Sequence, residues 1–138
     1  MEQEQYNQLL FYTLSHPDPA FFIHQYAVDA FAAQNADANT KNITLVYAVA
    51  GLYLAVERGF RGKEVQNAHL IFSKDKSDMP RIILPENRGE ITIKNVLEAE
   101  PGIDRDQMIL HWGASVWKTY QNNRDVIISY CNKHLSVI

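Results

Sequence analysis

The two leading candidates for chemistry lie in the first half of the chain, and they are His24 and Glu57. His24 falls near the centre of an apolar helical face, surrounded by Phe21, Ala27, Val28 and Phe31. Burying an imidazole without a partner is costly, so a side chain, a water, a metal or a ligand must meet its nitrogens. The simpler interpretation, which we favour, is a core histidine bonded to a neighbouring helix.

Glu57 lies on the apolar face of the segment 42–58, one residue before the expected helix end. Desolvation and the negative end of a helix both favour the protonated carboxyl, which can act as a general acid or a metal ligand. A carboxylate so near a helix end can also bend outward to Arg58 or Arg61. We favour this structural interpretation of Glu57.

His24 and Glu57 could meet if their helices are antiparallel neighbours, since bundles build metal centres from inward Glu and His side chains. The Glu-x-x-His signature of di-metal bundles is absent, as are HExxH, the P-loop, GxSxG and a dinucleotide fingerprint. The aromatic content of 11% permits a haem or similar planar ligand, although core packing explains the rings equally well. The cofactor is therefore unknown, with a metal or haem permitted and none required.

Three further polar residues are weaker candidates for a ligand or metal site. Asp29 lies about 140° around the helix from His24, so another element would have to supply the carboxylate of any His–Asp pair. Gln34 sits on the flank of the same apolar face and could tie down the following turn. His111 points about 100° away from Trp112 and reads as a surface histidine.

Leu110 and Trp117 both point nearly opposite to Trp112 on the helix expected over 104–120. Apolar side chains on the second side of a helix indicate another packed element or a subunit interface. Leu110 and Trp117 are therefore the interface candidates.

Size and composition describe one globular domain over residues 1–138, with 46% hydrophobic and 21% charged residues. The net charge of −3 argues against nucleic acid as a partner, because such proteins concentrate Lys and Arg on one face. Cys131 is the only cysteine, so neither an internal disulfide nor a thiolate metal cluster can form. The sequence begins with acidic and polar residues, unlike a secretory leader, and its longest apolar run, 43–56, is too short to span a bilayer. We therefore expect a cytoplasmic protein without membrane contact.

Hydrophobic periodicity predicts a mainly α-helical, single-domain bundle of about five to six helices. Gly59 is expected as a left-handed terminator, and Asp104 with Gln107 resembles a capping box. The Gly- and Pro-containing segment 60–92 predicts an irregular excursion, with a small β-hairpin of 82–84 and 90–93. The expected helices cover 3–15, a segment ending near Asn35, 42–58, 92–100, 104–120 and 124–135.

One segment, His24-Gln25-Tyr26-Ala27-Val28-Asp29-Ala30-Phe31-Ala32-Ala33-Gln34, resembles the signature of an uncharacterised microbial domain-of-unknown-function family of small helical proteins. In that family the signature precedes a helix ending in Glu-Arg-Gly, which Glu57-Arg58-Gly59 matches. The segments 88–92, 95–96 and 111–117 resemble its later motifs. The family often has His-Pro after the glutamine and paired histidines further on, where this chain has Asn35-Ala36 and Asn122-Asn123. The resemblance implies relatives without an established activity, and it draws attention to His24, Asp29, Gln34 and Glu57.

Two functional classes lead from the sequence, ahead of nucleic-acid binding, which the acidic balance disfavours. The favoured class is a non-catalytic helical binding or interaction module, with a homodimer as one form. The alternative is a small-ligand- or metal-binding protein, with a haem protein or metal-dependent enzyme as sub-cases. There His24 would be the ligand or general base, and Glu57 the acid or second ligand.

Overall fold

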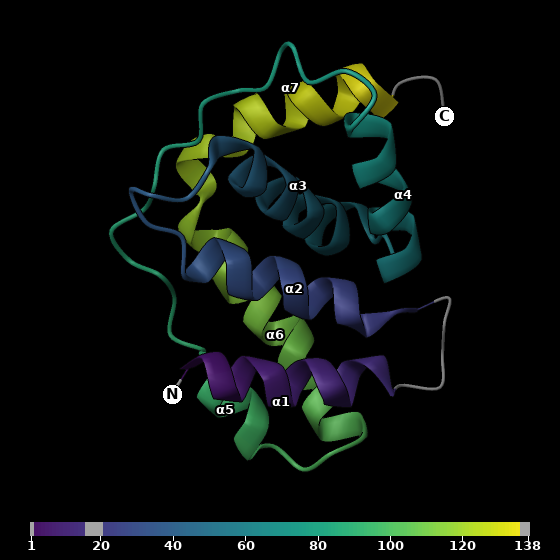
Figure 1. The fold of residues 1–138 in the computed structure, drawn as a ribbon, viewed down its shortest axis with the longest axis vertical. Helices are drawn as coiled ribbons and strands as arrows, with labels where there is room; N and C mark the ends of the chain where they lie inside the picture. The colour runs from purple at the N-terminus through teal and green to yellow at the C-terminus, as the bar shows by residue number, and fades with distance from the viewer. Residues whose placement is uncertain (1, 16–20, 136–138) are drawn as a thin grey trace.

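The computed structural model describes residues 2–15 and 21–135, and its regular secondary structure there is entirely helical (Figure 1). The mainly helical class is therefore confirmed, with seven α-helices and one short 3₁₀ helix in this part of the chain. They are α1 (Glu2–Leu14), α2 (Ile23–Gln34), α3 (Asn42–Arg58), α4 (Gly62–Phe72), α5 (Ile93–Glu98), α6 (Ile103–Thr119), η1 (Gln121–Asn123) and α7 (Arg124–Leu135).

The centre of the fold is the pair α2 and α3. In Figure 1, α2 lies between α1 and α3, and α6 passes behind it. α3 has buried residues on every side between Leu45 and Leu54, which is typical of a helix enclosed by others. It ends as expected at Gly59, whose φ of 69° places it in the left-handed region that glycine adopts without strain. None of the described helices combines the length and the apolar character needed to cross a bilayer.

α4 occupies part of the segment predicted to be irregular, and this corrects the helix count. Val65, Ala68 and Phe72 are buried at helical spacing, and Glu64 Oε1 accepts the Arg61 N–H at 2.8 Å to cap the first turn. Gly62 is not a helix breaker here. Its N–H donates to Phe21 O at 2.7 Å, and a Cβ would collide with the Phe21 and Phe22 carbonyls. A close backbone approach therefore requires this glycine.

The predicted hairpin of 82–84 and 90–93 is wrong, because helix side chains take the backbone groups that a strand partner would pair. Asn123 donates from Nδ2 to Ile83 O at 2.9 Å and accepts the Ile83 N–H at 2.8 Å. Asn42 likewise bonds Pro80 O at 2.8 Å and the Ile82 N–H at 3.1 Å. The segment between α4 and α5 thus follows the bundle surface as an extended strap held by side-chain amides (Figure 1).

The helix starts expected at Thr92 and Asp104 have different outcomes. Thr92 caps α5 as expected, with its N–H donating to Asn95 Oδ1 at 2.9 Å. α6 begins at Ile103, with Gly102 at its N-cap, so the box expected at Asp104 does not form. Asp104 and Asp106 lie instead in the first turn, where the helix dipole favours negative charge.

Candidate functional site

His24 is half-buried and bonded to the neighbouring helix α1, the arrangement that the simpler interpretation predicted. Its Nδ1 lies 3.0 Å from Thr13 Oγ1. The same hydroxyl lies 3.1 Å from Leu10 O, so Thr13 links the imidazole to the backbone of α1. Burial lowers the pKa of His24, so the neutral imidazole is favoured.

Glu57 is bonded to an arginine, as the favoured structural interpretation predicted, but the arginine is Arg124 of α7. Arg124 Nη2 donates to Oε1 at 2.6 Å and Arg124 Nε to Oε2 at 2.9 Å. Trp117 Nε1 also donates to Oε2, at 2.8 Å. The hydrogen bonds from Arg124 hold the pKa of Glu57 below its ordinary value. The partner expected at Arg58 or Arg61 is therefore Arg124, brought from the far end of the chain.

The structure does not bring His24 and Glu57 together. His24 bonds to α1, whereas Glu57 bonds to α6 and α7. Within residues 2–15 and 21–135, no group of three His, Cys, Asp or Glu side chains is placed to hold a metal ion. The candidates named from the sequence form no shared metal centre in this part of the chain.

Asp29 is the most deeply buried of the candidate acids, at 4% exposure between α2 and α3. Gln25 Nε2 donates to its Oδ1 at 3.1 Å. Its carboxyl lies against Gly51 of α3, where a Cβ would collide with Oδ2. Burial raises the pKa of Asp29 well above its ordinary value, so the neutral acid is favoured over a much wider pH range.

Gln34 joins three distant segments through one amide group. Its Nε2 donates to Ile91 O at 2.7 Å and Arg88 O at 3.0 Å, while its Oε1 accepts from Trp112 Nε1 at 2.9 Å. Arg88 returns two bonds from Nη1, to Gln34 O at 3.1 Å and Ala36 O at 2.6 Å. Residues that the family resemblance picked out thus form a network that ties residues 88–91 to α2 and α6. His111, in contrast, is exposed.

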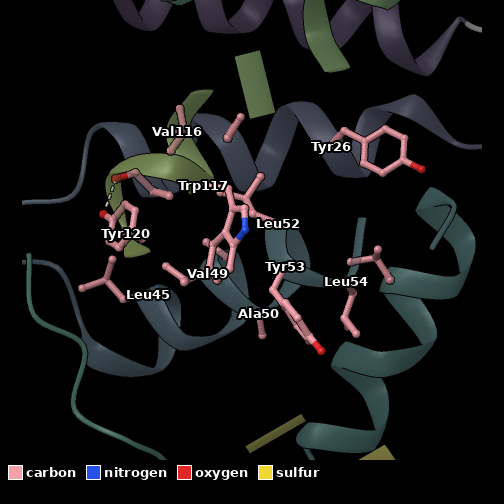
Figure 2. Close-up of a cluster of buried hydrophobic side chains, with 14 of the residues drawn as sticks. Tyr26, Leu45, Val49, Ala50, Leu52, Tyr53, Leu54, Val116, Trp117 and Tyr120 are labelled. Carbon is pink, nitrogen blue, oxygen red and sulfur yellow. Dashed lines mark hydrogen bonds between the residues drawn. The ribbon is translucent and has the colours of Figure 1, made fainter. Parts of the chain in front are cut away.

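The two interface candidates of α6 have different surroundings. Trp117 is only 3% exposed, packs on Tyr53 at 5.8 Å between ring centroids and bonds to Glu57. Figure 2 shows its indole among the side chains of α3, inside the core. The second apolar side of α6 is therefore largely covered by this chain's own helices, and Leu110, at 39% exposure, remains at the surface.

An apolar pocket of about 210 Å³ lies between α3 and α6, and we call it the α3–α6 pocket. Leu52 and Ala55 of α3 face Ile109, Leu110 and Gly113 of α6 across it. Tyr26, which also lines the pocket, donates its hydroxyl to Phe60 O at 2.6 Å. The walls are thus almost wholly hydrocarbon. Sequence reasoning named one of these residues, Leu110, as an interface candidate and did not predict the pocket, because helical periodicity does not show which small residues of distant helices will face one another.

An aromatic cluster between α3, α4 and α7 was also missed from the sequence. His69 Nε2 donates to Tyr47 O at 2.8 Å, and its ring stacks on that of Tyr47. His134 Nε2 lies 3.1 Å from Asp78 Oδ1, and its ring packs on Tyr130. The hydroxyls of Tyr47 and Tyr130 are buried without a hydrogen-bond partner among the described residues. The rings of these four residues and of Phe72 pack directly on one another, so the cluster joins α3, α4 and α7.

Comparison with known proteins identifies the family of this chain and no closer analogue. Neither the curated proteins nor the solved structures contain a match. One family model, described as a family of unknown function (DUF5946), matches residues 3–121. This range extends from the second residue of α1 to just past the end of α6, and it includes Gln34, Arg88 and Trp112 of the network that ties the fold. The chain therefore belongs to DUF5946, a family of unknown function.

Proposed function

We propose that this chain is a non-catalytic interaction module that forms a homodimer through the surface around the α3–α6 pocket. The observation that supports the proposal is the pairing of exposed apolar side chains with an apolar pocket at one place. Leu110 is 39% and Val56 42% exposed, and both line the pocket. An exposed apolar patch that also contains a pocket is typical of an interaction site.

A second copy is the occupant that best fits this surface. A two-fold dimer places the same patch of both subunits in contact, so the patch must be complementary to itself. An apolar cavity of about 150 Å³ accepts a molecule as large as benzene, so the α3–α6 pocket has room for a leucine side chain. Leu110 of each copy would enter the pocket of the other.

The charges beside the pocket agree with self-association. Arg61 lines the pocket, and Glu64, three positions further along the chain, carries the opposite charge. The Arg61 Nε to Glu64 Oε1 distance is 3.6 Å, with both side chains at least half exposed. A rim with both signs lets two copies place opposite charges across a two-fold axis, whereas a rim of one sign would repel its own copy.

The test is the oligomeric state of the purified protein by analytical ultracentrifugation across a concentration series. We expect a dimer whose dissociation constant rises about tenfold or more in Leu110→Glu, because a charge would enter an apolar pocket. The control is Leu70→Glu on α4, which is 61% exposed and lines no pocket that we find. A wild-type monomer, or a Leu110→Glu dimer of unchanged affinity, would refute the proposal. An apolar small molecule retained by a monomer in native mass spectra would assign the pocket to that ligand instead.

A further inference from the structure

The two most exposed large apolar side chains of the described residues line one groove. Phe11 of α1 is 77% exposed and Ile103 at the start of α6 is 76% exposed. They border a groove of about 580 Å³ between these two helices, which we call the α1–α6 groove. Leu14, one turn after Phe11, is also 61% exposed. Concentration of exposed apolar side chains around a concave surface marks a binding site rather than chance exposure.

The groove has a floor that is already fixed by internal bonds. Tyr12 donates its hydroxyl to Asp106 Oδ1 at 2.6 Å and accepts the Gly102 N–H at 2.9 Å. Arg105 lies 4.8 Å from the Tyr12 ring centroid and donates to Leu97 O at 2.9 Å and Ala99 O at 3.2 Å. Only 9% of Arg105 is exposed, so its guanidinium group is mostly engaged in these contacts within the protein. Because these bonds already hold the floor in place, binding a partner there would cost less conformational entropy.

The two stretches of chain that supply the walls of the groove carry a net negative charge. Residues 2–15 contain no lysine or arginine, and in residues 98–106 the only one is the inward-facing Arg105. Five carboxylates in these two stretches are exposed: Glu2, Glu4, Glu98, Glu100 and Asp104. Such a surface repels its own copy and anionic lipid, and it attracts a cationic partner. In this respect the α1–α6 groove differs from the α3–α6 pocket with its mixed rim.

We propose that the α1–α6 groove binds a basic amphipathic helix of a partner protein. The apolar face of that helix would lie on Phe11 and Ile103, and its lysines or arginines would face the surrounding carboxylates. This is the helix-in-groove mode, in which apolar residues spaced by three and four positions enter the groove. The inference uses a different surface from the proposed dimer and stands independently of it.

The experiment is fluorescence anisotropy with two labelled synthetic helices, one of leucine and lysine and one of leucine and glutamate. We expect the wild-type protein to bind the leucine–lysine helix and not the other. Phe11→Asp should weaken that binding about tenfold or more, because the groove loses an apolar wall. Non-specific charge attraction predicts the reverse, since the substitution makes the surface more acidic.

Leu70→Asp is the matched control, because it makes the same change of charge at an exposed leucine of α4 and should not weaken binding. Backbone amide shifts of the complex should concentrate in residues 8–15 and 102–106, and Leu110→Glu should bind the helix as wild type does. Failure of the wild type to bind, equal binding of both helices, or equal affinities of Phe11→Asp and Leu70→Asp would overturn the proposal.

Discussion

At the residue scale, Asp29 is the side chain whose environment departs furthest from what its chemistry prefers. A carboxylate at 4% exposure, with one amide donor and a glycine Cα against it, has lost most of its hydration. The sequence identified Asp29 through a family resemblance and through its position away from His24. It could not show the burial, because the side chain is enclosed by α3, a different segment of the chain.

Asp29 predicts a specific pH dependence of stability. Since the pKa of the folded protein is raised, the folded state holds one proton more than the unfolded state between the two pKa values. The free energy of unfolding should then fall as pH rises from the ordinary Asp range through the folded pKa, and Asp29→Asn should remove this slope. Urea denaturation over a pH series measures it, and parallel curves for the two proteins would contradict the prediction.

Glu57→Gln is the control for this series, because the pKa of Glu57 is shifted in the opposite direction. A lowered folded pKa means that the contribution of Glu57 is present above the unfolded pKa and is lost as pH falls through the folded pKa. The two variants should therefore change the slope of stability against pH in opposite senses.

At the scale of elements, the contact between α2 and α3 depends on Gly51. Asp29 of α2 occupies the space where a side chain on Gly51 would stand, and Val65 of α4 closes it from another side. Gly113 of α6, in contrast, faces Leu52 across an ordinary contact distance of 3.5 Å from its virtual Cβ. Two glycines inside long helices thus have different physical roles.

Alanine substitution distinguishes these two roles. Gly51→Ala should destabilise the protein by about 2 kcal/mol or more, because the methyl group overpacks against the Asp29 carboxyl. Gly113→Ala should be neutral or stabilising by up to about 1 kcal/mol, because it raises helix propensity without a clash. Chemical denaturation gives both values. A Gly51→Ala protein as stable as Gly113→Ala would show that α2 and α3 separate easily, against the contact described here.

At the scale of the whole molecule, the local sequence pattern predicted the bounds of the helices better than the contacts between them. The bounds of α3 and α7 follow from the sequence, since α3 ends at a left-handed glycine and α7 begins after two asparagines. α4 was missed because Gly62 was taken for a breaker when it serves a close approach to Phe21. The Glu57–Arg124 pair joins residues 67 positions apart, and no periodicity of either helix reports such a contact.

We predict that the whole chain unfolds as a single cooperative unit. Trp112 and Trp117 are both buried on α6, and they bond to α2 and α3 respectively. We expect tryptophan fluorescence and far-ultraviolet circular dichroism to give one coincident unfolding transition. Separate midpoints for the two signals would divide the chain into more than one folding unit and would contradict the single domain expected from its size.

The bonds from α2 to α6 also bear on how the protein is made. Tyr120 donates to Ala33 O at 2.5 Å across 87 positions, and Trp112 reaches Gln34 across 78. A chain that emerges from the ribosome in order therefore exposes the sides of α2 and α3 that face α6 long before α6 exists. Both helices contain many apolar residues, and those that α6 covers stay exposed until α6 has been made. The nascent chain should accordingly need protection from chaperones until α6 and α7 have emerged, since α7 supplies the last buried side chains of the core.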